Sequence, residues 1–414
     1  MKQLKKIQFI LLAALTLVYG CHRDPIDGPD TTPQKARQTF IMYAVADNNL
    51  FHYLRGNINM AKGAVAQGLP EGSRVLVYYD GNIDSEGNHL TCITEIVRNG
   101  DSAEEVILKQ YDDLNSADPL VMSMVLNDAV ELAPADSYGV AFLGHGTGWF
   151  PPALNNLQQP MSISAASDPA SEHGLFKYDD ALTRAYGPDR SDYMSPQDIA
   201  RALSTVDMDY LIFDVCFMSS IELLYDLRNV ADYVVASPAE VMGDGIPYHR
   251  IIPILLGSTS NLEQRLSRSV EAIYEYYSTQ SYPSASFTVV RTSDIAAVAD
   301  AAKAVFASGV REPDLGEIQY LEGLQPNHAF FDLKDYMRNI AVSESAYRSF
   351  EQAVDNAIVS ERHTPQIYSA FGSWSGGFFD ADSVCGISSY IPRDYLPVTQ
   401  AAYFETAWAK YTRL

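Results

Sequence analysis

The feature that most constrains the fold of this chain is a regular alternation of short apolar runs with helical patterns. Five apolar runs each end in a polar or glycine-rich cluster, and they cover residues 40–45, 74–79, 138–143, 210–213 and 233–236. Helical periodicity or helix-start signals lie between them, at 50–67, from Asp118-Pro119, from Ser195-Pro196 and at 223–229. Strands that alternate with helices predict βαβ units, and therefore an α/β fold whose mostly parallel sheet is flanked by helices on both faces.

The other segments vary this pattern. Residues 89–98 and 104–110 alternate apolar and polar side chains, which predicts a small hairpin. After about residue 260 we expect helices at 262–277, 295–306, 330–340, 345–358 and 398–411, with strands at 285–291 and 386–391. This half either extends the first sheet or forms a small domain of its own. We divide the chain into a main domain, 38–260, and an α/β portion, 261–414, that packs on it.

Composition narrows the class of protein and its partners. The 414 residues are enough for a large core, and the 20% of charged residues is ordinary for a soluble globular protein. The net charge of −23 argues against nucleic acid as a partner but would attract basic peptides. No CxxC or His-x3-His spacing suggests zinc, so we predict no metal site.

The N-terminus predicts export. Residues 1–20 combine three early lysines with an apolar stretch at 9–18, as in a signal peptide, and residues 17–21 resemble a bacterial lipobox that ends at Cys21. We expect a lipid on Cys21, a flexible tether over 21–37, and a membrane-anchored lipoprotein in the periplasm or on the cell surface. The alternative is a secretory signal that is cut elsewhere.

The strongest chemical signal surrounds Cys216. The run 210–213 reads as a buried strand, and the helical pattern that follows contains Ser219 and Glu222 at the spacing of a capping box. Cys216 therefore lies where a strand passes into a helix. The positive end of a helix dipole favours the thiolate there, so this position suits a nucleophile.

Parallel strands bring their carboxyl ends to one edge of a sheet, which is where α/β sheets bind ligands. The polar residues expected at this edge are Asp47, Asp80, His145, Asp214, Cys216 and Asp244. A cysteine and a histidine brought together there are the minimal parts of a thiol nucleophile and its general base. The alternatives are an inert core thiol, a histidine that caps a turn, and aspartates that brace loops.

Several motifs resemble the clostripain family of cysteine endopeptidases, which share the caspase-like fold with caspases, legumains and gingipains. The resemblance rests on residues 42–50, 80–82, 144–149, 214–218, 243–248 and 386–392. The His-Gly-x-Gly-Trp and Asp-x-Cys-x-Met elements, in this order and each after an apolar strand, are its most specific part. The similarity extends from about Gln38 to the C-terminus, with 38–260 as the catalytic domain.

Carried over by position, the resemblance makes His145 the general base and Cys216 the nucleophile. It implies an oxyanion hole of backbone N–H groups, those of Gly146 and Cys216, and cleavage of peptide or protein substrates after Arg or Lys. Asp214 matches the family's S1 pocket position, and Asp244 is our second pocket candidate. A carboxylate on the same strand face as Cys216 would raise the thiol pKa, so we expect the strand to bend between them.

The resemblance also implies maturation by internal cleavage after a basic residue. Residues 151–194 form a long insertion between the His145 and Cys216 strands, and it contains the processing candidates Lys177, Arg184 and Arg190. We expect no required cofactor. Calcium enters only through the resemblance, because clostripain is calcium-dependent whereas this chain has no EF-hand-like loop.

Two alternatives to this function remain open. One is a catalytically silent, peptidase-like surface lipoprotein that binds peptides or glycans. The other keeps the enzyme but changes its specificity, because Asp214 alone does not define a pocket. Apart from Cys21, the chain has Cys92, Cys216 and Cys385, and three thiols cannot all pair. We expect Cys92 and Cys385 to be core residues.

Overall fold

The computed structural model describes residues 35–83, 88–150, 194–324, 327–370 and 377–413. The predicted signal peptide, the lipidation site Cys21, most of the tether and nearly all of the insertion lie outside the described residues, as do Lys177, Arg184 and Arg190. Within the described ranges, no helix is long and apolar enough to span a bilayer.

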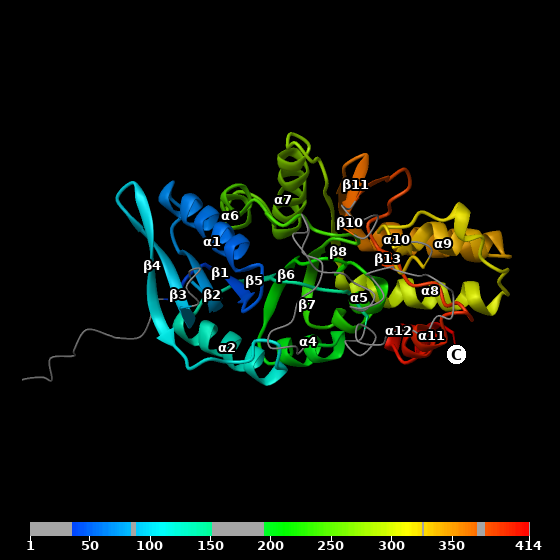
Figure 1. Cartoon of the computed structure of the whole chain (residues 1–414), viewed down its shortest axis with the longest axis horizontal. Coiled ribbons are helices and arrows are strands. Elements are labelled where there is room, and N and C mark those ends of the chain that lie inside the picture. Colours follow the sequence, from blue (N-terminus) through cyan, green and yellow to red (C-terminus); the bar gives the residue numbers. More distant parts are fainter. Residues whose placement is uncertain (1–34, 84–87, 151–193, 325–326, 371–376, 414) are drawn as a thin grey trace, which may run out of the picture. The chain divides into compact units, whose positions relative to one another are not determined.

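The fold is organised by a nine-stranded sheet with the order β10-β8-β7-β6-β5-β1-β2-β3-β4 (Figure 1). Its five central strands are those predicted from the apolar runs: β1 (Gln38–Ala46), β2 (Ser73–Asn82), β5 (Tyr138–Leu143), β6 (Met208–Asp214) and β7 (Ala231–Ala236). Every pair of neighbours among them is parallel. The predicted α/β architecture is confirmed, and the loops that follow β5 and β6 leave the sheet side by side.

Antiparallel strands extend the sheet on both flanks. The predicted hairpin, β3 (His89–Asn99) and β4 (Ser102–Gln110), joins the sheet beside β2. On the opposite flank, β8 (Ser286–Arg291) pairs with β7, and β10 (Ile358–His363) pairs with β8. Part of the chain after residue 260 therefore continues the first sheet.

Helices cover both faces of the sheet (Figure 1). One layer holds α1 (Phe51–Ala66), α6 (Tyr248–Leu255) and α7 (Leu262–Tyr277), which pack in that order. The other layer holds α2 (Pro119–Leu132), α4 (Pro196–Leu203), α5 (Ile221–Leu227), α8 (Ile295–Ala307), α10 (Glu344–Ala357) and α12 (Ala407–Thr412). Because both faces are covered, the central strands are buried and almost continuously apolar.

Two of the predicted helix starts are confirmed by their caps. The side chain of Asp118 accepts a hydrogen bond from the N–H of Leu120 at the start of α2. Ser195 and Asp198 form a reciprocal capping box at the start of α4, with Pro196 in the first turn. Both helices therefore begin where the residue pattern predicts.

The capping box predicted at Ser219 and Glu222 is wrong. Helix α5 begins at Ile221, and its N-cap residue makes no side-chain capping bond. Instead, the Ser219 hydroxyl donates to the carbonyl of Gly386 at 2.7 Å, and the Glu222 carboxylate accepts from the N–H of Tyr390 at 2.9 Å. Both polar side chains bind a distant segment, so tertiary contacts override the local capping pattern.

The C-terminal predictions need smaller corrections. The expected helix 330–340 begins instead with β9 (Phe331–Asp332) and continues as α9 (Leu333–Ile340), and the expected strand 386–391 is reduced to β13 (Ser388–Ser389), which pairs with β9. The expected final helix is divided into α11 (Pro397–Phe404) and α12, because Thr406 caps the second helix through the N–H of Ala409. The remaining short elements are η2 (Thr292–Asp294), η3 (Leu315–Glu317), β11 (Gln366–Ser369) and β12 (Gly377–Asp380).

Candidate active site

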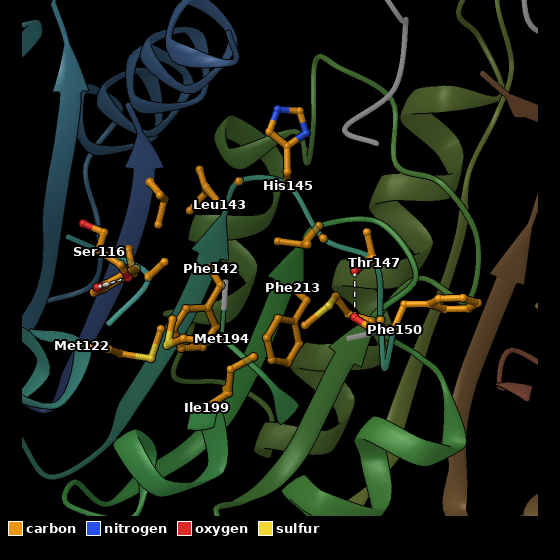
Figure 2. Close-up of a pocket in the computed structure, with 18 residues that line it drawn as sticks. Ser116, Met122, Phe142, Leu143, His145, Thr147, Phe150, Met194, Ile199 and Phe213 are labelled. Carbon is orange, nitrogen blue, oxygen red and sulfur yellow. Dashed lines mark hydrogen bonds between the residues drawn. The ribbon is translucent and has the colours of Figure 1, made fainter. Parts of the chain in front are cut away.

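His145 lies in the glycine-rich loop that leaves β5. Figure 2 shows its imidazole ring at the rim of a pocket, pointing away from the other labelled side chains. The Nε2 atom lies 2.9 Å from Oδ1 of Asn49, a residue in the loop after the neighbouring strand β1. Because an amide oxygen only accepts, this contact places the ring proton on Nε2 and makes Nδ1 the basic nitrogen.

Cys216 lies two residues after the end of β6, and its side chain is fully buried. The backbone N–H of Val241, in the loop after β7, donates to its Sγ atom at 3.1 Å. A donor in this position stabilises the thiolate more than the thiol. A peptide carbonyl reaches this sulfur only after the covering atoms have moved.

The loops that carry His145 and Cys216 pack directly against each other. A Cβ atom placed on Gly146 would lie 2.2 Å from Cγ1 of Val215 and 3.2 Å from the carbonyl oxygen of Cys216. Any side chain at position 146 would therefore force the two loops apart. The structure thus brings the two predicted catalytic motifs together through a glycine.

Strand β6 ends at Asp214 and the chain bends at Val215, between Asp214 and Cys216 as expected. Phe217 has a φ of +62°, and it is the one non-glycine residue in the described ranges with a positive φ. Its ring stacks on Phe330 at a centroid distance of 4.2 Å, and its N–H donates to the carbonyl of Ala239. These contacts hold a conformation that costs about 1–2 kcal/mol for an L-residue.

The two S1 candidates occupy different environments. The Asp214 carboxylate is fully buried and accepts hydrogen bonds from the N–H of Ile246 at 3.2 Å and from the hydroxyl of Tyr248 at 3.1 Å. Asp244 is exposed, and its backbone carbonyl accepts from the side chain of Asn57. In this conformation Asp214 therefore braces the loop that presents Asp244.

A mainly apolar pocket lies beneath His145, and His145, Gly146 and Val215 are part of its lining (Figure 2). It encloses about 120 Å³, and its apolar lining includes Tyr43, Met122, Phe142, Met194, Ile199 and Phe213. Among the residues that the structure describes, none of those lining it is acidic, so this lining suits an apolar side chain and not a guanidinium or ammonium group. The sequence pattern did not predict this pocket, because its walls come from strands and helices far apart in the chain.

Cys92 contrasts with Cys216. Burial raises the pKa of Cys92 to about 11, and the side chain lies within β3 away from any catalytic motif. Burial and the nearby Asp332 carboxylate raise the pKa of Cys385 as well. Cys92, Cys216 and Cys385 form no disulfide in the structure. The expected core role of Cys92 agrees with its full burial, whereas Cys385 is only half-buried.

Asn49 is the site residue that sequence reasoning missed. The residue pattern places Asp47 at the carboxyl edge of the sheet but assigns no role to Asn49. Asn48 is the residue that closes this turn, since its Oδ1 accepts from the N–H of Leu50 at 2.9 Å. That turn carries Asn49 to His145, which lies 96 positions away in the chain.

Comparisons with known proteins agree with this geometry. The model of the clostripain family matches residues 42–161 and 170–409. An inactive zymogen C11 protease from Parabacteroides distasonis is 26% identical and superposes with a TM-score of 0.75, over 92% of this chain and 99% of that one. No curated protein sequence matches this chain.

A second solved structure is a secreted C11 cysteine protease from Bacteroides thetaiotaomicron, called iotapain. It is 24% identical, with a TM-score of 0.75, over 92% of this chain and 100% of that one. A secreted C11 cysteine protease from the same organism was solved with an irreversible peptide inhibitor. It is 24% identical, with a TM-score of 0.74, over 91% of this chain and 99% of that one. The family match covers nearly all of the described sheet and both catalytic motifs. This chain belongs to the clostripain family of cysteine proteases.

Proposed function

We propose that this cysteine protease cleaves peptide bonds after Arg or Lys, with Cys216 as the nucleophile and His145 as the general base. The observation that carries the assignment is the packing of Gly146 against Val215 and Cys216, which sets the histidine loop on the cysteine loop. Asn49 fixes the imidazole in the tautomer that leaves Nδ1 basic. We assign Asn49 as a positioning residue.

The chemistry follows from these roles. His145 takes the thiol proton, and the Cys216 thiolate attacks the scissile carbonyl, so that a C–S bond forms and an oxyanion develops. The backbone N–H groups of Gly146 and Cys216 donate to this oxyanion. Collapse of the intermediate breaks the C–N bond, and the imidazolium protonates the leaving amine. Water activated by His145 then hydrolyses the thioester and releases the thiol.

The preference for basic residues rests on Asp214 and Asp244. A guanidinium or ammonium group that enters beside the loop after β7 would replace the Tyr248 hydroxyl as a partner of the Asp214 carboxylate. Asp244 lies on the same loop and is exposed to an incoming side chain. The net charge of −23 further favours the approach of basic peptides.

We infer that the uncleaved chain is latent. Full burial of Cys216 supports this inference, and the similar Parabacteroides protein is described as an inactive zymogen. Cleavage after Lys177, Arg184 or Arg190, within the insertion that joins the two catalytic loops, would free those loops to move. The mature chain would be held at the membrane by a lipid on Cys21; the secreted relative from Bacteroides supports export.

The test uses the mature protein and its Cys216→Ala variant with fluorogenic peptides that end in Arg, Lys, Asp or Leu. Each peptide is assayed with and without calcium, before and after limited trypsin treatment. We expect Cys216-dependent release after Arg and Lys, stronger after processing. Release confined to Asp or Leu would overturn the Asp214 assignment. Processed protein that is silent on all four peptides would contradict the proposed specificity and the dyad together.

A further inference from the structure

A histidine and two aspartates meet at the β2–β3 hairpin, outside the loops that carry His145 and Cys216. Asp80 lies near the end of β2, and His89 is the first residue of β3, opposite Asn82. Asp113 follows β4 and approaches the same point from the segment that leads to α2. One ligand atom from each of the three residues lies within 4.8 Å of the other two.

The distances fit a shared ion better than direct hydrogen bonds. Nε2 of His89 lies 3.6 Å from Oδ1 of Asp80 and 3.8 Å from Oδ1 of Asp113. An N–H···O hydrogen bond is about 2.9 Å long. Two ligands of a tetrahedral zinc ion, each about 2.0–2.1 Å from the metal, lie about 3.4 Å apart. The two separations that involve His89 are thus close to the distance between two ligands of one bound cation.

The Asp80 carboxylate is buried and held in place. Its Oδ1 accepts from the hydroxyl of Thr91 at 2.6 Å, and its Oδ2 accepts from the hydroxyl of Ser116 at 2.5 Å. Ser116 is itself 2.8 Å from the Tyr78 hydroxyl. Hydrogen bonds of this kind orient the ligands of metal sites. A carboxylate oxygen has a second lone pair, so Oδ1, which lies 3.6 Å from Nε2 of His89, can still bind a cation.

Charge also favours a cation here. The Asp80 side chain is 0% exposed, and in the described part of the chain its one ion-pair partner is His89. Burying a carboxylate is costly unless a charge or hydrogen bonds compensate it. A divalent ion shared with Asp113 would add that compensation.

We propose that Asp80, His89 and Asp113 form a binding site for a divalent metal ion that accepts an imidazole ligand, with Zn²⁺ as the best fit. Calcium and magnesium prefer all-oxygen ligand sets, whereas a nitrogen with two carboxylate oxygens suits zinc. The side chains of His89 and Asp113 are 26% and 58% exposed, so water completes the coordination.

The site is structural and not a part of the cleavage chemistry. Asp80 pairs in register with Val45, and Gly81 pairs with Ala46, at the end of the strand that leads to Asn49. Ser116, which binds Asp80, lines the apolar pocket beneath His145. A bound ion would cross-link the hairpin to the segment after β4, and would stiffen one side of the active site.

The test begins with mature protein that carries Cys216→Ala, so that a thiolate cannot bind metal at the active site. After treatment with a chelator, the protein is titrated with Zn²⁺ by calorimetry and with Co²⁺ by visible absorption. Thermal unfolding is followed with Zn²⁺, Ca²⁺ and Mg²⁺ in turn. We expect one zinc per chain and a higher Tm with zinc, because an ion that binds only the folded state stabilises it.

Two ligand variants and one control localise the ion. His89→Ala and Asp113→Asn should each weaken zinc binding more than tenfold, since losing a residue that only orients a metal ligand already costs 10–100-fold. Asp113 is exposed, so its variant will fold. His363→Ala is the control, because His363 pairs with Glu361 at 2.8 Å far along the chain and should leave zinc binding unchanged.

Three results would overturn the proposal. One is zinc binding that is equal in the parent, His89→Ala and Asp113→Asn proteins. Another is no zinc or cobalt binding by folded parent protein. The third is a Tm that rises with Ca²⁺ or Mg²⁺ but not with Zn²⁺, which would contradict the assigned class of ion.

Discussion

The two polar regions at the carboxyl edge of the sheet use similar residue types in opposite ways. Around β5 and β6, backbone N–H groups surround the acidic atoms: Val241 donates to the Cys216 sulfur and Ile246 donates to Asp214. Around β2 and β3, by contrast, the donors to Asp80 are side-chain hydroxyls, and the side chains of His89 and Asp113 approach the same carboxylate. Donors that converge stabilise negative charge, whereas acceptors that converge stabilise a cation.

The connections between strands explain this difference. Loops after parallel strands cross over the sheet edge and turn sharply, as at Phe217, so their amides point into the site. In an antiparallel hairpin the backbone amides donate hydrogen bonds to the neighbouring strand, as in the β2–β3 register. Side chains are then the groups that remain to bind a ligand. The first region therefore suits attack on a carbonyl, and the second suits metal binding.

The largest expected effect distinguishes the reactive cysteine from a merely buried one. Cys216→Ala should lower kcat/KM at least about 10⁴-fold, as loss of a nucleophile does in comparable enzymes. Cys92→Ala, the matched control, removes an equally buried thiol and should keep most of the activity. Steady-state kinetics on an Arg peptide measures both. Equal losses in the two variants would show that the effect of Cys216 is structural.

Separating the two catalytic loops should have the next largest effect. Gly146→Ala places a methyl group 2.2 Å from Cγ1 of Val215, so the loops must shift. A displacement of about 1 Å costs about a hundredfold in kcat. Gly63→Ala, within α1, meets no atom within 4 Å and should be neutral or slightly stabilising. Near-normal kcat in Gly146→Ala would contradict the loop contact.

The pH dependence of the free energy of unfolding tests whether Glu222 is buried and protonated in the fold. Burial raises the pKa of Glu222 from 4.5 to about 7, so the folded protein binds its proton more tightly than the unfolded chain does. This contribution to the free energy of unfolding is complete below about pH 4.5. It is lost as the pH rises through 7 and amounts to about 3 kcal/mol.

Glu222→Gln removes that titration, and the free energy of unfolding should then fall less between pH 5 and 8. Denaturant unfolding at several pH values measures the slope. Glu344→Gln is the control, because this exposed residue lies on α10 and pairs with Arg348 at the surface. Parallel pH profiles for the parent and Glu222→Gln would rule out a protonated, buried Glu222.

Asn49 should have the smallest of these effects, and a specific one. Asn49→Ala should lower kcat about tenfold with little change in KM, because the imidazole loses the oxygen that orients Nε2. Asn49→Asp keeps the acceptor and adds a charge, which should raise the pKa of the His145 imidazole and shift the acidic limb of the pH–rate profile upward. A profile that stays in place would show that Asn49 does not contact His145 during catalysis.

Much of the central architecture was predictable because it depends on local patterns. The apolar runs that became β1, β5 and β6 are long enough to need burial on both faces, and the caps at Asp118 and Ser195 act within one helical turn. Glu222 shows where such reasoning stops. Its spacing from Ser219 fits a capping box, but in the fold its carboxylate accepts a hydrogen bond from the N–H of Tyr390 in a buried segment instead.

The sequence by itself determined the fold class and the pair of motifs that carry Cys216 and His145, because strand–helix alternation and the positions of residues after strands are local properties. Only the tertiary structure decided the partners of those residues. Asn49 lies beside His145, and Asp113 lies beside Asp80 and His89. These contacts depend on the order of the strands in the sheet, which no local sequence pattern determines. The physical reason is that sheet order is set by burial of the whole apolar surface, and every contact between loops follows from it.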